Sequence, residues 1–227
     1  MENDRGPALE AIRVSRSFGR GGQVLAALKE VSVSVARGEV VAIMGPSGSG
    51  KSTLLYALAG LDQPDSGTVK LAGTDWNSLA GTDRAGFRRR NCGFIAQGMT
   101  LLPQATAAEN IEAPLLLDGV KIADRARRVA QALDRVAMTR LADSLTDELS
   151  GGEQQRIAIA RALVLDPSVV LADEPTGSLD AATAQVIARL LVAAATERGA
   201  AVVLVTHDPA IARHATRIIT LNSGALA

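Results

Sequence analysis

The residues with the clearest capacity for chemistry form a glycine-rich segment that ends in lysine and serine. Residues 45–52 read GPSGSGKS and match the spacing G-x-x-x-x-G-K-[ST]. Glycines at this spacing let consecutive backbone N–H groups curl around a phosphate, and a following helix N-terminus adds its positive end. Lys51 could then reach β- and γ-phosphates, and the Ser52 hydroxyl could coordinate Mg²⁺. A glycine turn before a solvated lysine is the alternative, but the apolar run 40–44 just upstream favours phosphate binding.

A pair of acidic residues at the end of another apolar run forms a second candidate site. Residues 169–172 read VVLA and lead into Asp173 and Glu174. A carboxylate at the carboxyl end of an inner parallel strand lies at the sheet edge where ligands bind. Asp173 suits Mg²⁺ held through its water shell, and Glu174 could polarise a water for in-line attack on a γ-phosphate. Without the phosphate-binding segment, a solvated acidic pair would explain these two residues equally well.

Both sites need strands and helices to position them, and the sequence predicts such elements in alternation. Residues 31–35 alternate Val and Ser, which predicts a strand with one buried face. Short apolar runs predict strands covered on both faces, as in a parallel sheet flanked by helices, at 40–44, 169–172 and 202–205. Helical patterns span residues 51–60, 105–117, 124–138, 152–165 and 181–198, with stop signals at Gly60, Gly119, Pro167 and Gly199. Strands that alternate with helices predict an α/β domain with a parallel sheet.

The middle third of the chain departs from this alternation. From about residue 99 to residue 150 there is no convincing strand pattern, only amphipathic helical patterns rich in Ala, Leu and Arg. We therefore predict a helical subdomain inserted between two parts of an α/β core. The sequence shows no internal repeat, low-complexity tract or long linker.

Composition excludes several classes of protein. The 227 residues are 47% apolar, and 24 basic residues balance 24 acidic ones, which excludes a disordered chain and argues against a protein that coats polyanions. Aromatic residues make up 2% of the chain, too few for a base-stacking RNA platform or an aromatic-lined sugar groove.

Cys92 is the single cysteine, which excludes an internal disulfide and fits a reducing cytosol. The longest apolar runs, such as 202–205, are far shorter than the ~18 residues that cross a bilayer. Residues 1–4 lack the pattern of a signal peptide, so we expect a soluble chain.

A second glycine segment narrows the choice among proteins with a phosphate-binding loop. Residues 149–156 read LSGGEQQR before a helical pattern, which predicts another helix N-terminus able to bind an anion. Ser-Gly-Gly alone would be explained by a serine cap with flexible glycines. The whole octapeptide, with Asp173 and Glu174 following at this spacing, resembles the signature of ATP-binding cassette (ABC) ATPases. The resemblance extends from about Leu9 to Leu226.

Further positions match motifs of that family in order along the chain. Gln97, after a predicted strand at 93–96, is similar to the Q-loop glutamine. Residues 175–180 (PTGSLD) look like the segment that ends in the D-loop, and His207 is similar to the switch histidine. A strand-end histidine bonded to a backbone carbonyl is the alternative for His207.

Phe18 stands where the family places an aromatic ring against adenine. An aromatic side chain near a strand end is often part of the core, which is the alternative interpretation for Phe18. His214 lies in a helical surface pattern and receives no role.

The resemblance implies an ATPase with ATP and Mg²⁺ as cofactors and a P-loop NTPase (RecA-like) fold. Residues 1–97 and 153–227 would form the α/β core with a parallel sheet and an N-terminal antiparallel β subdomain, and residues 98–152 would form the helical subdomain with the signature motif at its end. The implied nucleotide-binding residues are Phe18, Gly45, Pro46, Ser47, Gly48, Ser49, Gly50, Lys51, Ser52, Thr53, Ser150, Gly151, Gly152 and Asp180. The implied catalytic residues are Glu174, His207, Gln97 and Lys51, and the implied metal ligands are Ser52, Gln97 and Asp173.

In ABC ATPases, the signature of one subunit closes over the nucleotide held by the other subunit's phosphate loop. Ser150 and Gly152 would therefore serve a partner's ATP in a head-to-tail homodimer, and the monomer should hydrolyse ATP poorly. His207 would contact the γ-phosphate and the attacking water, and Gln97 would approach Mg²⁺ and report occupancy to a partner. Because Glu174 is present, both sites of a homodimer should be competent.

Within the family the sequence is most similar to the nucleotide-binding subunits of MacB/LolD/FtsE-type systems. The supporting segments are residues 43–55, 60–62, 101–103, 108–111, 114–115 and 172–177. This implies a separately encoded integral membrane permease, association with the cytoplasmic face of the membrane through that permease, and no nucleic-acid partner. The chain ends about where the core should end, so we expect no appended regulatory or membrane domain. A mechanotransmitting ATPase that moves no substrate, or a soluble ABC ATPase without a transport role, are the alternatives.

Two surface features leave the partner's identity open. Relatives commonly carry phenylalanines beside the Q-loop glutamine, whereas Ala96, Gly98 and Met99 surround Gln97 here. This is where the membrane subunit's coupling helix should dock. Residues 88–90 are three consecutive arginines, which form either a solvated charge run or a contact with an acidic partner or membrane headgroups.

Overall fold

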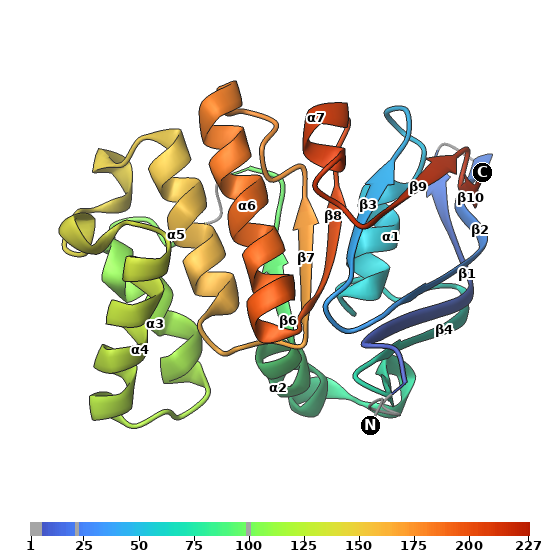
Figure 1. Ribbon diagram of the computed structural model, residues 1–227. Helices are drawn as coiled ribbons and strands as arrows, with labels where there is room; N and C mark the ends of the chain where they lie inside the picture. The colour runs from blue at the N-terminus through green and yellow to red at the C-terminus, as the bar shows by residue number, and fades with distance from the viewer. Residues whose placement is uncertain (1–5, 21–22, 99–100) are drawn as a thin grey trace, which may run out of the picture.

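The computed structural model describes residues 6–20, 23–98 and 101–227, so Met99 and residues 1–4 lie outside the described residues. Two sheets pack with helix α1 between them, and a layer of helices lies beside the outer strand of the larger sheet (Figure 1). The parallel sheet, the antiparallel N-terminal sheet and the flanking helices confirm the predicted fold class.

The larger sheet runs in the order β10-β9-β3-β8-β7-β6. Its strands are β3 (Val40–Met44), β6 (Cys92–Ile95), β7 (Val169–Asp173), β8 (Ala201–Val205), β9 (Arg217–Asn222) and β10 (Ala225–Leu226). Strands β6, β7, β8, β3 and β9 are parallel, and β10 returns antiparallel to β9. The predicted strands at 40–44, 169–172 and 202–205 are confirmed, and the strand predicted at 93–96 begins one residue earlier.

The smaller sheet is antiparallel, in the order β2-β1-β4-β5. Its strands are β1 (Leu9–Arg20), β2 (Gln23–Val35), β4 (Ser66–Leu71) and β5 (Thr74–Asp75). In β2, Val31, Val33 and Val35 are buried while Ser32 and Ser34 are exposed, as the alternation predicts. This face of the small sheet packs on the leucines of α1.

The α-helices are α1 (Lys51–Leu58), α2 (Gly81–Asn91), α3 (Ala107–Leu117), α4 (Ile122–Arg135), α5 (Gly151–Leu163), α6 (Ala181–Arg198) and α7 (Pro209–Ala212). Short 3-10 turns occupy Trp76–Ser78, Thr139–Leu141 and Thr146–Glu148. Helix α6 has the predicted bounds because Asp180 caps its first N–H groups and Gly199 ends it in a left-handed conformation. Helix α3 starts two residues after its predicted start because Thr106 and Glu109 form a capping box there.

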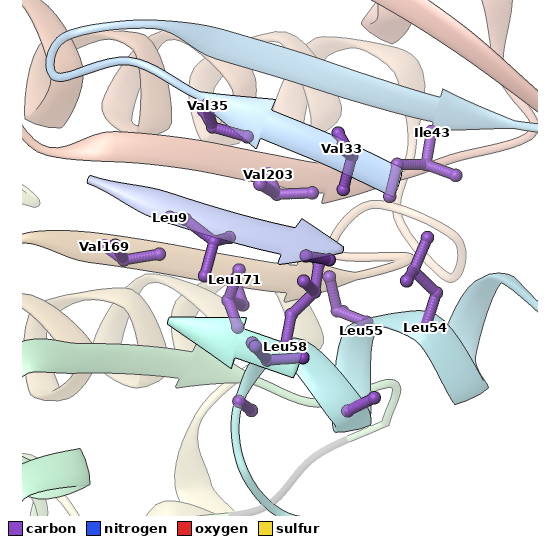
Figure 2. Close-up of a cluster of buried hydrophobic side chains, with 14 of the residues drawn as sticks. Leu9, Val33, Val35, Ile43, Leu54, Leu55, Leu58, Val169, Leu171 and Val203 are labelled. Atoms are coloured by element: carbon purple, nitrogen blue, oxygen red, sulfur yellow. The ribbon is translucent and has the colours of Figure 1, made fainter. Parts of the chain in front are cut away.

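Burial on both faces explains the apolar runs in the parallel strands. On one face Val169, Leu171 and Val203 pack with Leu54, Leu55 and Leu58 of α1 and with the small sheet, as Figure 2 shows. On the other face Val170, Val202 and Leu204 pack against Ile187 and Leu191 of α6. Each fully buried leucine or valine stabilises the fold by about 1.5–3 kcal/mol. The two layers thereby fix the end of β3, where the phosphate-binding segment begins.

Helices α3, α4 and α5 form a separate cluster around Ile111, Leu115, Leu133, Met138 and Ile157. They lie together on one side of the larger sheet (Figure 1). The boundaries 98 and 152 drawn from the sequence for a helical subdomain stay a prediction. Among the described residues, no helix is both long and apolar enough to cross a membrane.

The three arginines at 88–90 form hydrogen bonds with other residues of the same chain. Arg89 donates from Nε and Nη2 to Oδ1 of Asp118 at 3.3 and 3.0 Å, and Arg90 Nη1 reaches the same oxygen at 3.3 Å. Arg88 Nη1 donates to the Gly60 carbonyl oxygen at 3.3 Å. Arg89 and Arg90 therefore tie α2 to the end of α3, and Arg88 ties it to the turn after α1. Neither of the two sequence interpretations anticipated these contacts.

Replacing Asp118 by Asn should lower the free energy of unfolding by about 1 kcal/mol, because a neutral acceptor is left facing two guanidinium groups at a site where the carboxylate is largely buried. Urea unfolding followed by circular dichroism measures the loss. Asp124→Asn is the matched control, since Asp124 pairs with Arg127 at the exposed surface and its loss should cost less than about 0.5 kcal/mol. Equal losses in the two variants would contradict a stabilising contact between α2 and α3.

Candidate functional site

The glycine segment is a tight loop between β3 and α1, and its neighbours explain its glycines. Gly45 has φ 148°, and a Cβ there would lie 2.1 Å from the Leu221 carbonyl oxygen. Gly50 has φ 102°, and a Cβ there would lie 2.3 Å from the Ala27 carbonyl oxygen. The loop is thus held between β2 and β9. No side chain in the described part of the chain caps the start of α1, so its first N–H groups point into the loop.

Two side chains of α1 bind at the loop and at the neighbouring strand. Lys51 Nζ donates to the carbonyl oxygens of Gly45 and Pro46 at 2.9 and 2.8 Å, which holds the ammonium across the loop. Ser52 Oγ donates to Oδ1 of Asp173 at 3.2 Å. The loop and the carboxyl end of β7 therefore meet, as the sequence predicts for parallel strands.

Asp173 is fully buried, and its Oδ2 has no hydrogen-bond partner within the described residues. The pKa of this carboxyl is raised above its ordinary value, mainly by burial and also by the neighbouring charge of Glu174. The Ser52 hydrogen bond opposes this rise. A buried carboxylate oxygen without a partner is costly unless a cation or water satisfies it. The site therefore has one acceptor available for such a ligand.

Glu174 and His207 form a pair beside the loop. Glu174 has φ 46°, and its N–H donates to the Val205 carbonyl oxygen at 3.0 Å, which turns its side chain out of β7. Its Oε2 lies 2.9 Å from His207 Nδ1. In the tautomer that carries its hydrogen on Nδ1, the imidazole donates to this carboxylate. The glutamate side chain is 14% exposed and the histidine 71%, so the acid is shielded while the imidazole faces solvent.

An open cleft of about 940 Å³ brings these groups together. Its walls include most of the predicted site residues, namely Phe18, Gly45, Ser47, Gly48, Gly50, Lys51, Ser52, Thr53, Gln97, Glu174 and His207. Pro46 and Ser49 are outside its lining; Ser49 is buried, and Pro46 contributes its carbonyl to Lys51. The cleft is also lined by Gly98, which lies beside Gln97, and by Gly177 and Ser178 of the PTGSLD segment. The lining residues that sequence reasoning missed are Leu25, Ala26, Ala27, Lys29, Val205 and Ser223. Most of these come from strand edges and turns that carry no motif, so only the fold reveals them.

Phe18 forms part of the cleft wall and is 42% exposed, which contradicts the alternative of an ordinary core side chain. The guanidinium of Arg16 lies 4.9 Å from the centre of its ring. Arg16 is itself fixed by hydrogen bonds of 2.8–2.9 Å to Asp62 and Asp65. The ring is therefore oriented by a cation–π contact and still faces the cleft.

The structure does not bring Ser150, Gly151, Gly152 or Asp180 to this cleft. Ser150 lies exposed before α5, and its hydroxyl and N–H both donate to Oε2 of Glu153, at 2.7 and 2.8 Å. These two bonds lower the pKa of Glu153. Asp180 is exposed and caps α6. The signature segment therefore presents its own face to solvent, separate from the loop of the same chain.

Comparison with known proteins identifies relatives over nearly the whole chain. A family model described as "ABC transporter" matches residues 28–177. The lipoprotein-releasing system ATP-binding protein LolD of Bordetella pertussis is 45% identical over 225 residues, which cover 99% of this chain and 97% of that protein. The LolD 1 protein of Rhodopirellula baltica is 44% identical, with 94% and 93% covered. The macrolide export ATP-binding/permease protein MacB of Salmonella choleraesuis is 44% identical over 95% of this chain but only 33% of its own length.

Solved structures agree with the sequence relatives. The dimeric structure of MJ0796, a bacterial ABC transporter cassette, superposes with a TM-score of 0.89 at 40% identity over 96% of both chains. A dimeric post-hydrolysis state of the same cassette bound to ADP and Pi gives the same TM-score at 39% identity. The resemblance stated from the sequence is confirmed by all these comparisons. On the strength of the family model and of full-length relatives above 40% identity, this chain belongs to the ABC transporter family.

Proposed function

We propose that this chain is the ATP-hydrolysing subunit of a membrane complex and that two copies close head-to-tail around two ATP molecules. A separate membrane subunit would then carry out lipoprotein release or export, with the ATPase bound to its cytoplasmic face. The observation that carries this proposal is the cleft in which Lys51, Ser52, Glu174 and His207 converge while Ser150 lies outside it. The LolD relatives, which match over 93–97% of their own length, support the ATPase-subunit assignment.

The proposed reaction uses the residues in distinct roles. The loop N–H groups and Lys51 bind the phosphates, which requires the ammonium to leave the Gly45 and Pro46 carbonyls. Glu174 accepts a proton from the attacking water, and His207 holds the carboxylate through Nδ1. The exposed edge of the His207 ring can then face the γ-phosphate. Excluding water from the site requires the second subunit, because the cleft of one chain is open.

Mg²⁺ fits the residues at the bottom of this site. Asp173 Oδ2 is buried and without a partner in the described structure, the Ser52 hydroxyl lies beside Oδ1, and Gln97 lines the cleft. Oxygen donors of this kind suit a hard cation that also binds phosphate oxygens. Among the described residues, no group of three His, Cys, Asp or Glu side chains could hold a metal ion. Oxygen atoms of the phosphates would therefore have to complete the coordination of Mg²⁺. Bound there, the cation would neutralise charge on the phosphates, with Ser52, Gln97 and Asp173 holding it directly or through water.

Phe18→Ala should weaken ATP binding by about 5- to 150-fold, because stacking of a base on an aromatic ring contributes about 1–3 kcal/mol. Isothermal titration of the monomer with Mg-ATP measures the dissociation constant. Phe18→Tyr is the matched control, since it keeps the ring and the Arg16 contact and should bind like the parent chain. If the alanine variant binds ATP with unchanged affinity, the adenine does not lie on Phe18.

The membrane role is tested by purifying the tagged chain from detergent-solubilised membranes of its own cell. We expect an integral membrane protein to co-purify, and ATP hydrolysis by the complex in proteoliposomes to release its cargo. Absence of any membrane protein in that preparation, with ATPase activity intact, would contradict the assignment to a membrane complex.

A further inference from the structure

The signature segment lies against α6 at Gly152, which faces Thr183. A Cβ at residue 152 would lie 2.7 Å from Thr183 Cγ2. Carbon atoms in contact ordinarily stay about 3.5–4.0 Å apart. Gly152 does not have a positive φ, so its backbone conformation would accept alanine. The need for glycine at this position therefore comes from one methyl group.

That methyl group cannot easily move. The Thr183 hydroxyl donates to Asp180 Oδ2 at 2.6 Å, and the Thr183 N–H donates to Oδ1 of the same carboxylate at 3.0 Å. A β-branched side chain in a helix already has few χ1 rotamers, and the hydroxyl bond selects one of them. Rotating the methyl away from Gly152 would break the contact with Asp180.

Capping of α6 does not by itself require this arrangement. Asp180 Oδ1 already accepts from the N–H groups of Ala182 and Thr183, both at 3.0 Å, which is the usual N-cap pattern. The hydroxyl bond to Oδ2 is an additional contact, and its effect is to aim the Thr183 methyl at Gly152. One side chain thus joins the D-loop aspartate to the signature glycine.

We propose that Thr183 is a positioning residue that holds the signature segment Ser150–Gly152 and Asp180 as one unit, so that both reach the second subunit's nucleotide together. The proposal rests on the head-to-tail dimer proposed above. It assigns control over ATP-dependent closure to Thr183, which does not line the cleft of its own chain. It also predicts that residues 152 and 183 compensate for each other.

The test uses a Glu174→Gln background, in which ATP-bound dimers should persist, and measures dimerisation by sedimentation with Mg-ATP. Four chains are compared with that background: Gly152→Ala, Thr183→Ser, the double variant, and Gly152→Ala combined with Thr196→Ser. Ser at 183 keeps the hydroxyl for Asp180 and removes the methyl. The Cβ of an alanine at 152 would then meet only Oγ and Cβ of residue 183, at the 3.7 and 3.8 Å that such a Cβ would have from Thr183 Oγ1 and Cβ. Thr196 is an exposed threonine of the same helix whose hydroxyl bonds to Val192, so it serves as the control.

Gly152→Ala should weaken dimerisation at least about tenfold, because overpacking displaces one of the two segments. The double variant should return to within about threefold of the background, whereas the Thr196 control should stay as weak as Gly152→Ala. Binding of ATP by the monomers should be unchanged in every chain. Normal dimerisation of Gly152→Ala, no rescue by Thr183→Ser, or loss of monomer ATP binding would overturn the role of Thr183. Failure of the Glu174→Gln background itself to dimerise would instead contradict the head-to-tail dimer.

Discussion

Glu174→Gln is expected to lower the rate of ATP hydrolysis by about 10²- to 10⁴-fold, because the amide cannot accept the proton of the attacking water. ATP binding should be retained, since the loop, Lys51 and Asp173 are untouched and the amide has nearly the same shape. With hydrolysis blocked, the ATP-bound dimer should accumulate. Phosphate release measures the rate, and size-exclusion chromatography with and without Mg-ATP measures the dimer.

Glu197→Gln is the matched control for this variant. Glu197 lies exposed near the end of α6, so the same chemical change there should leave hydrolysis and dimerisation unaltered. Unchanged turnover in Glu174→Gln would mean that another group accepts the proton. The pairing of Glu174 with His207 would then be a structural contact only.

Ser150→Arg is expected to abolish hydrolysis while leaving the ATP affinity of the monomer nearly intact. Ser150 is exposed and lies outside the cleft of its own chain, so a bulky cation there should not disturb the phosphate loop. In the head-to-tail dimer the same arginine would block the approach of the signature segment to the partner's nucleotide. Steady-state ATPase rates and titration of the monomer with Mg-ATP give the two quantities.

Ser66→Arg is a suitable control, because Ser66 is an exposed serine of β4 in the antiparallel sheet, apart from both segments. It should hydrolyse ATP like the parent chain. Collapse of monomer ATP binding in Ser150→Arg would show that Ser150 acts within its own chain. Full activity of that variant would remove the signature segment from the reaction.

Sequence predicts the parts of this fold whose causes are local. The phosphate loop, the buried strands at 40–44 and 169–173, and α6 with its Asp180 and Gly199 caps all follow from short patterns. Strand β1 does not, because its register against β2 and β4 shifts near Arg13, which has φ 45°, and the apolar alternation breaks there. Irregular pairing of this kind is set by the partner strands.

The residues of the site also fall into those that the sequence predicts and those that depend on distant parts of the fold. The residues proposed to bind phosphate could be predicted because such a ligand dictates their spacing. The carbonyls of Ala27 and Leu221, which make Gly50 and Gly45 obligatory, belong to distant strands and have no sequence signal. The contacts of Arg89 with Asp118 and of Gly152 with Thr183 likewise depend on how the helices pack.

Mixing two inactive chains tests the head-to-tail arrangement most directly. Lys51→Ala lacks a working phosphate loop but keeps its signature segment, and Ser150→Arg has the opposite defect. In a mixed head-to-tail dimer, one nucleotide site carries both defects and the other site is intact. Half of the dimers in an equal mixture should be mixed, and each of these has one working site. Mixing should therefore restore ATPase activity to about a quarter of the parent rate. If the mixture stays as inactive as either chain alone, each nucleotide is served by a single chain and the head-to-tail dimer is wrong.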